Sequence, residues 1–218
     1  MFTGIIEGFG TIRSIKASGK GEGKIFSIDS DFELTGTKLG DSIAVNGACL
    51  TAVAISHKKF DVDVAHETLS MSTHGKSVSG ERVNLERAMR LSDRLDGHLV
   101  SGHIDGTGII KEKKNLGNAV IVTISISKDL SSQMIKKGSV AIDGISLTIN
   151  KLEPESFEIS IIPHTAKITT IGIKNAGDRV NIETDMIGKY VQKFVLGKKE
   201  DKKTSNIDMN FLTKTGFL

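Results

Sequence analysis

Hydrophobic and polar residues alternate in short runs along most of the chain, which is typical of β-strands buried on one side. Runs rich in β-branched residues occupy positions 24–29, 42–47, 50–55 and 59–64, and then 120–126, 139–143, 146–152 and 156–162. Residues 129–138 have a different pattern that predicts a helical turn. Turn residues separate the runs, and we expect about six short strands in each half of the chain.

The two series of strands are copies of one another. FTGIIEGFGTI (2–12) returns as VSGHIDGTGII (100–110), an offset of 98 residues. SIAVNGACLT (42–51) returns as SVAIDGISLT (139–148), and GERVNLE (80–86) returns as GDRVNIE (177–183), at an offset of 97. One extra residue, at Asp41, explains the change of offset. Residues 1–97 and 98–186 are therefore predicted to be two domains of one fold.

Short strands with glycines at their bends and only two prolines in the chain favour a barrel. Closure of a small antiparallel sheet leaves no exposed edge strand. The predicted fold class is all-β, with two tandem six-stranded antiparallel Greek-key barrels.

After Asp185 the apolar residues change to a helical period. The stripe consists of Ile187, Tyr190, Val191, Phe194 and Val195. Residues 187–218 are predicted to be a C-terminal helix and tail, in which 198–203 is a solvated linker and 210–218 a docking segment or a frayed end. The helix can cap a barrel or pair with copies of itself around a symmetry axis, and its spacing leaves both open.

Composition narrows the class of protein. The chain has 218 residues, 38% of them hydrophobic, enough for a buried core. A net charge of +3, 5% aromatic residues and no tryptophan argue against nucleic-acid binding. No apolar run approaches the ~20 residues of a membrane span, and the N-terminus does not resemble a secretion signal. With one cysteine, Cys49, no internal disulfide can form, and we expect a cytoplasmic protein without a membrane partner.

Four segments together, MFTGIIEG (1–8), NGACLT (46–51), GHLVSGH (97–103) and DGISLT (143–148), resemble the riboflavin synthase family of the α-chain type, which is built from two lumazine-binding barrels. The resemblance covers residues 1–196. It implies that two molecules of 6,7-dimethyl-8-ribityllumazine exchange a four-carbon unit, giving riboflavin and 5-amino-6-ribitylaminouracil.

The resemblance also implies how the protein works as an assembly. No metal or external cofactor takes part. Family members are homotrimers held largely by the C-terminal helix, which favours self-association of the helix predicted here. Active sites form between the first barrel of one chain and the second barrel of a neighbour. Partnership with lumazine synthase is a pathway expectation only.

Matched positions of the two copies differ where unequal roles are expected. Cys49 corresponds to Ser146, Ile5 to His103, His66 to Pro163, and Glu67 to His164. The threonine pairs Thr51 and Thr148, and Thr68 and Thr165, are retained, and their hydroxyls suit a ribityl chain or a heterocyclic carbonyl. The retained residues predict that both copies bind the substrate in a similar way. The divergent residues predict that the two identical substrate molecules have different roles in the reaction.

The resemblance places Cys49, His103, Ser146, Asp185 and Phe2 near the reacting centre. Cys49 is predicted to add to C7 of one lumazine or to hydrogen-bond near it, the alternative being a small buried hydrophobe. His103 is predicted to shuttle or donate a proton. Asp185 can orient a nucleophile or water, or cap the helix that follows. Phe2 can stack on the heterocycle or be a plain surface residue.

His98 and His103 are five residues apart, which invites a zinc interpretation. No cysteine or carboxylate cluster supplies further ligands, so we expect no metal site. His98 is predicted to be structural.

The remaining candidate residues form the walls of two binding sites. In the first barrel these are Gly4, Ile5, Ile6, Cys49, Leu50, Thr51, Asp63, Val64, Ala65, His66, Glu67 and Thr68. In the second they are Gly102, His103, Ile104, Lys137, Ser146, Leu147, Thr148, Ile161, Ile162, Pro163, His164, Thr165 and Ala166. The family often has an acid where His164 stands and a leucine where Ala166 stands.

A non-catalytic carrier of lumazine or flavin is the main alternative, because such proteins use the same barrels. A carrier is free to lose reactive positions, whereas this chain keeps Cys49, His103, Ser146 and Asp185 together. The sequence therefore favours the enzyme. A nucleic-acid-binding pair of barrels would need aromatic platforms and a basic groove.

Overall fold

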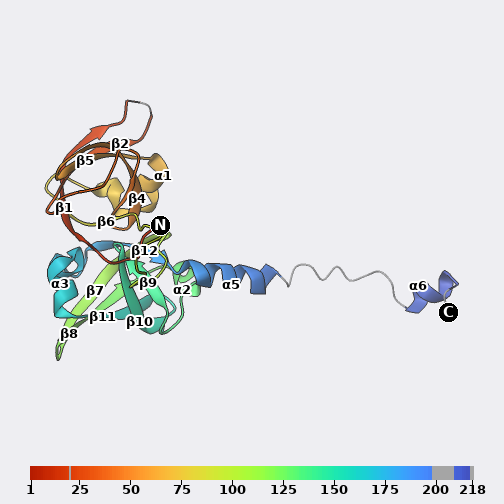
Figure 1. The fold of residues 1–218 in the computed structure, drawn as a ribbon. Helices are drawn as coiled ribbons and strands as arrows, with labels where there is room; N and C mark the ends of the chain where they lie inside the picture. Colours follow the sequence, from red (N-terminus) through yellow and green to blue (C-terminus); the bar gives the residue numbers. More distant parts are fainter. Residues whose placement is uncertain (20, 198–208, 217–218) are drawn as a thin grey trace. The chain divides into compact units, whose positions relative to one another are not determined.

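The computed structural model describes residues 1–19, 21–197 and 209–216, and these contain two closed six-stranded antiparallel barrels (Figure 1). Neighbouring strands follow the order β1-β2-β5-β4-β3-β6 in the first barrel and β7-β8-β11-β10-β9-β12 in the second. The order is the same in both copies, which confirms the predicted fold class.

The strands also bend at the same places in both copies. The first barrel contains β1 (Gly8–Ala17), β2 (Lys24–Ser30), β3 (Ser42–Val45), β4 (Ala48–Ser56), β5 (Lys59–Val64) and β6 (Arg82–Arg87). The second contains β7 (Gly106–Leu116), β8 (Ala119–Ser125), β9 (Ser139–Ile142), β10 (Ile145–Glu153), β11 (Ser156–Ile161) and β12 (Arg179–Thr184). Register shifts follow Ile12 and Ala52, and recur after the matched Ile110 and Ile149. Bulges increase strand bending, which closure of a small barrel requires.

Short helices connect the strands and follow the barrels. The described helices are α1 (His66–Met71), the 3₁₀ helix η1 (Thr73–Lys76), α2 (Lys128–Ser132), α3 (Pro163–Ile168), α4 (Thr170–Ile173), α5 (Met186–Gly197) and α6 (Met209–Lys214). The turn expected within 129–138 is confirmed by α2. The hydrophobic pattern does not reveal α1, α3 or α4, because segments of one or two turns are too short to have a measurable helical period.

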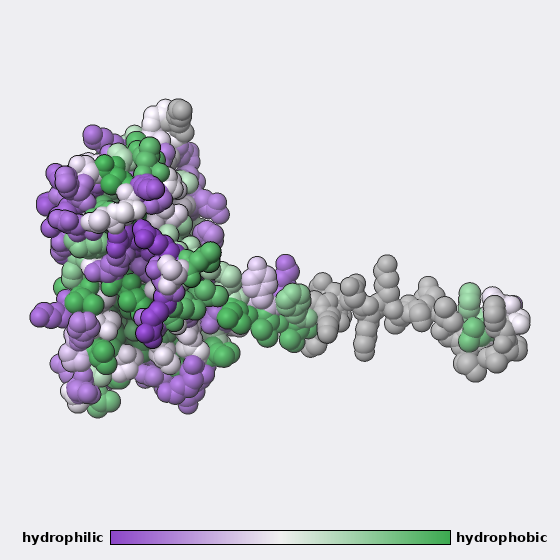
Figure 2. Space-filling view, in the orientation of Figure 1, coloured by the Kyte–Doolittle hydropathy of each residue, from purple (hydrophilic) through white to green (hydrophobic). Residues whose placement is uncertain are grey.

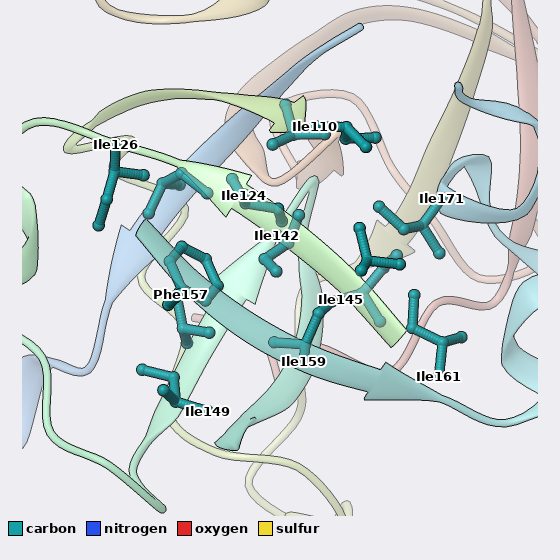
Figure 3. Packing of buried hydrophobic residues seen from close by; sticks show 14 of the residues in the cluster. Ile110, Ile124, Ile126, Ile142, Ile145, Ile149, Phe157, Ile159, Ile161 and Ile171 are labelled. Atoms are coloured by element: carbon teal, nitrogen blue, oxygen red, sulfur yellow. The ribbon is translucent and has the colours of Figure 1, made fainter. Parts of the chain in front are cut away.

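Each barrel is filled by the inward side chains of its own strands. The first core contains Phe26, Phe60 and Leu85, all essentially inaccessible to solvent. The second is rich in isoleucine, and Figure 3 shows Ile124, Ile142 and other isoleucines around Phe157. Alternation on the strands therefore sends every second side chain inward and leaves the residues between them for the outer surface.

Buried amides link the two barrels. The Nδ2 of Asn84 donates to the backbone oxygen of Asp143 at 2.9 Å, and the matched Asn181 donates to the backbone oxygen of Asn46 at 2.8 Å. All four side chains are inaccessible. Because an unpaired amide would be costly here, these hydrogen bonds favour one relative placement of the barrels.

The interface departs from the repeat at its charged residues. Asp143 corresponds to the neutral Asn46, and its carboxylate is 2.5 Å from the Nζ of Lys174. Asp143 is fully buried, and the Lys174 side chain is 15% exposed. His74, also fully buried, stands where the second copy has Ile171. The Nε2 of His74 lies 2.9 Å from the backbone oxygen of Val45, to which the neutral ring can donate.

We expect His74 to make the fold sensitive to acid. Burial lowers the pKa of His74, although Glu81 and Asp143 oppose the shift. The unfolded chain, with a histidine pKa of about 6.5, therefore binds the proton first. The contribution to stability is fully present above about pH 6.5 and is lost as the pH falls below it.

Urea unfolding at several pH values tests this expectation. In His74→Ile, which adopts the residue of the second copy, the free energy of unfolding should change less between about pH 7.5 and pH 5 than in the unchanged chain. Equal changes in the two proteins would contradict the prediction.

The chain divides into two compact units, Met1–Met186 and Ile187–Leu218. The predicted C-terminal helix is present as α5, and its apolar stripe is exposed, with Tyr190 at 58% and Phe194 at 70% (Figure 2). The predicted linker at 198–203 lies outside the described residues, and α6 occupies part of the predicted docking segment. The domain boundaries at residues 97 and 186 stay predictions.

Of the helices within the described ranges, none has both the length and the apolar character that a bilayer crossing requires.

Candidate functional site

Residues 2–6 and the matched residues 100–104, called here the crossing segments, pass from the barrel of their own copy to the other barrel. Phe2 and Val100 pair in an antiparallel bridge, donating to one another's backbone oxygens at 2.8 and 3.1 Å. Beyond the bridge, the backbone N–H of Cys49 donates to the oxygen of Gly102, and that of Ser146 donates to Gly4, both at 2.8 Å. Each barrel is therefore completed by the crossing segment of the other copy.

The crossing corrects the sequence-based grouping, which kept Gly4–Ile6 with the first barrel and Gly102–Ile104 with the second. Ile6 is 7% exposed and belongs to the core of the second barrel. Ile104 packs against the core of the first. Because both copies carry the same apolar residue at this position, the pattern alone could not assign either segment to its barrel.

The first candidate site, called here the first cradle, is an outer surface of the first barrel. Cys49 and Thr51 point outward from β4, with Asp63 of β5 directly opposite Thr51. Ala65, His66 and Glu67 are exposed at the start of α1, with Thr68 behind them. Gly102, His103 and Ile104 complete this surface from the other copy. Leu50 and Val64 are buried inward, so they can contribute backbone only.

The second cradle is the matching surface of the second barrel. Ser146 and Thr148 point outward from β10 with Leu147 between them, and Lys137 is exposed nearby, its N–H donating to Ile149 at 2.8 Å. Around α3 lie Ile162, Pro163, His164, Thr165 and Ala166, of which the first three are exposed. Gly4, Ile5 and Ile6 complete the surface. Ile161 is buried in the core.

The crossing gives the two cradles different side chains at a matched position. The N–H of His103 donates to Ser101 Oγ at 3.1 Å, and that of Ile5 donates to Thr3 Oγ1 at 3.2 Å, so the local turns are alike. Both side chains are exposed. The first cradle therefore combines the Cys49 thiol with a histidine, a group able to transfer protons near neutral pH.

The second cradle has its histidine from a different place. The Nδ1 of His98 is 2.7 Å from the Oγ of Ser146. Burial lowers the pKa of His98, while the charge of Asp185 acts in the opposite direction. A neutral ring can accept the Ser146 hydroxyl proton and draw electron density onto the serine oxygen. His98 was predicted to be structural, and its contact with Ser146 had no sequence signal because the first copy has no counterpart.

The Nε2 of His98 has no hydrogen-bond partner among the described residues and is buried. Such an atom is costly unless water or a ligand group reaches it.

Phe2 is fully buried against Ala44, Val100 and Ala141. Its ring therefore cannot stack on a ligand without moving. We expect Phe2 to act through packing, since its backbone forms the bridge from which Gly4 and Gly102 extend.

Sequence reasoning missed two carboxylates, Glu86 and Glu183, that hold the crossing segments. Glu86 is 4% exposed and accepts from Thr3 and Gly4, while Glu183 is 2% exposed and accepts from Ser101 and Gly102. Their retention at the end of GERVNLE and GDRVNIE was the available signal, since solvated surface charges have no need to recur.

Both cradles are open surfaces. A cavity of about 660 Å³ adjoins the second cradle at Ile5 and extends over the first barrel, and Cys49 and Ser146 do not line it. It is lined by residues 35–37, 41–42, 86–90, 93, 94 and 96 together with Thr3, Ile5 and Glu7. We favour the cradles because they contain the thiol, hydroxyl and imidazole groups.

Among the described residues, no group of three or more histidine, cysteine or acidic side chains is arranged to hold a metal ion.

Comparisons with known proteins show the family of the chain. Residues 3–88 and 101–185 match the lumazine binding domain family. The riboflavin synthase of Actinobacillus pleuropneumoniae is 46% identical over 217 residues, with 100% of both chains covered. That of Bacillus subtilis (strain 168) is 43% identical over 217 residues, again with 100% of both covered.

Solved structures with bound ligands are also similar. LumP complexed with 6,7-dimethyl-8-(1'-D-ribityl) lumazine has a TM-score of 0.73 at 26% identity, covering 84% of this chain and 99% of LumP. LumP complexed with riboflavin has a TM-score of 0.76 at 27% identity, with the same coverage.

Proposed function

The chain belongs to the riboflavin synthase family, and we propose that it converts two molecules of 6,7-dimethyl-8-ribityllumazine into riboflavin and 5-amino-6-ribitylaminouracil. The observation that carries the proposal is the pair of matched cradles with different reactive groups, Cys49 with His103 in one and Ser146 with His98 in the other. Two identical substrates need similar surfaces, and their unequal roles need different side chains.

Positioning supplies much of the catalysis. Holding two heterocycles face to face replaces a bimolecular encounter, and effective molarities can reach about 10⁵ M or more in well-oriented cases. The two products together contain all the atoms of the two substrates. The reaction therefore needs no external oxidant or reductant.

The cradle side chains are the candidates for the chemistry: His103 is exposed, whereas Cys49 and Ser146 are half-buried, Cys49 against the cluster around Phe2. The proposed role of His103 is to take the proton from the acidic C7 methyl of one lumazine or to return it. The proposed role of Cys49 is to add to C7 of a lumazine or to donate a hydrogen bond to it. In the second cradle, Ser146 polarised by His98 can orient a nucleophile or water, with Asp185 favouring positive charge on the imidazole.

The open cradles support a homotrimer in which a first cradle of one chain faces a second cradle of its neighbour. A ligand sandwiched in this way would be covered on both faces. The exposed stripe of α5, which includes Val191 at 56% and Phe194 at 70%, is apolar enough to hold such an assembly. We further propose a cytoplasmic location. Association with lumazine synthase stays a prediction.

Turnover distinguishes this enzyme from a carrier. Purified protein is mixed with 6,7-dimethyl-8-ribityllumazine, and the loss of lumazine and gain of riboflavin are followed by absorbance and chromatography. The proposal expects one riboflavin for every two lumazines consumed. Tight binding without riboflavin would favour the carrier, and no binding would refute both.

A further inference from the structure

The carboxylates Glu86 and Glu183 bind the crossing segments in the same way. One oxygen of Glu86 accepts from the N–H and Oγ1 of Thr3 at 2.6 and 2.8 Å, and the other accepts from the N–H of Gly4 at 3.0 Å. One oxygen of Glu183 accepts from the N–H and Oγ of Ser101 at 2.6 and 2.7 Å, and the other accepts from Gly102 at 2.9 Å.

Each carboxylate lies in one barrel but acts on the cradle of the other. Glu86 belongs to β6 of the first barrel, and Gly4, which it holds, accepts the N–H of Ser146 in the second cradle. Glu183 belongs to β12 of the second barrel, and Gly102 accepts the N–H of Cys49 in the first cradle. The side chains that follow these glycines are the ones that distinguish the cradles.

A purely packing role would not require carboxyl groups here. Burial raises the pKa of Glu86, with the hydrogen bonds from Thr3 and Gly4 opposing the shift, so the carboxylate is retained against a desolvation cost. Three donors converge on its two oxygens. A glutamine has one acceptor oxygen, and its NH₂ would face a backbone N–H instead.

We propose that Glu183 is a positioning residue for the first cradle and Glu86 for the second, each acting through the backbone of its crossing segment. That the cradles are substrate sites rests on the proposed function. The positioning of each cradle by a carboxylate of the other barrel, called here the crosswise pattern, is a property of the fold and can be measured without turnover.

Cys49 is the only cysteine of the sequence and reports on the first cradle. We compare iodoacetamide alkylation rates in Glu183→Gln and Glu86→Gln. Loss of hydrogen bonds that hold Gly102 over Cys49 should raise the rate in Glu183→Gln about fivefold. Glu86→Gln should leave it unchanged, although Glu86 is in the same barrel as Cys49.

Amide hydrogen exchange gives the reciprocal readout. Exchange of the Ser146 N–H should become about fivefold faster in Glu86→Gln and stay unchanged in Glu183→Gln, with the opposite result for the Cys49 N–H. Thermal unfolding of both variants measures any general loss of stability. General loosening would speed the exchange of both amides in each variant, which differs from the expected crosswise pattern.

Milder variants keep the test decisive if a glutamine variant does not fold. Ser101→Ala and Thr3→Val each remove the hydroxyl that donates to the carboxylate, together with the hydrogen bond that this hydroxyl accepts from the N–H of His103 or Ile5. The backbone donors to the carboxylate remain, so the same crosswise pattern should appear with smaller changes. Equal effects on both cradles, or effects confined to the carboxylate's own barrel, would overturn the proposal. A crosswise pattern in a protein that forms no riboflavin would leave the positioning intact and refute the proposed function.

Discussion

Replacing Gly102 by alanine is expected to lower the free energy of unfolding by roughly 2–4 kcal/mol and to reduce riboflavin formation about 100-fold. Gly102 has a φ of +83°, a conformation that costs other residues about 1–2 kcal/mol. A Cβ there would also lie 2.5 Å from the Cβ of Cys49 and 2.9 Å from its nitrogen, so the segment must move away from the first cradle. A displacement of about 1 Å can cost two orders of magnitude in rate.

Gly177 provides the matched control. Its φ is +96°, but nothing lies within 4 Å of the Cβ that alanine would add. Gly177→Ala should therefore show only the conformational cost of about 1–2 kcal/mol, with turnover nearly unchanged. Urea unfolding and steady-state kinetics of the two variants measure the difference. If the two variants have the same stability and turnover, the inference that Gly102 must pack closely on Cys49 is wrong.

Repetition made the fold predictable. The segments at 42–51 and 139–148 keep one register over the rest of both copies, which implies matched strands, and their alternation identifies inward and outward positions. This is sufficient to expect two barrels and to place Cys49 opposite Ser146. Nothing in the pattern identifies helices as short as His66–Met71, because one or two turns lack a periodic signal.

The repeat also made the exchange of the crossing segments impossible to predict from the sequence. Since Gly4 and Gly102 stand in equivalent sequence contexts, either arrangement of the crossing segments preserves the hydrophobic pattern. Only the packing of Ile6 and Ile104 against opposite cores decides between them. The contact between His98 and Ser146 was unpredictable for another reason. Residue 98 begins the second copy, and at the offset of 98 no residue of the first copy corresponds to it.

Placing charge on α5 is expected to have the largest effect on activity. In the homotrimer proposed above, the double substitution Val191→Asp and Phe194→Asp should separate the chains into monomers. Riboflavin formation should fall roughly 10³-fold or more, because the proposed facing of cradles would supply the effective concentration of the second substrate. The two side chains are 56% and 70% exposed and lie on one stripe. An aspartate buried in an apolar interface is strongly unfavourable.

Two controls test whether the loss of activity comes from the loss of assembly. Lys193 is exposed but lies off the apolar stripe, so Lys193→Ala should keep both the oligomeric mass and the turnover. Riboflavin should still bind to the monomeric variant, because each cradle is complete within one chain once the crossing segments are in place. Sedimentation velocity, riboflavin titration and turnover separate these properties. A monomeric variant with full turnover would mean that the two cradles of a single chain suffice for the reaction, and the proposed facing of cradles between neighbours would then be wrong.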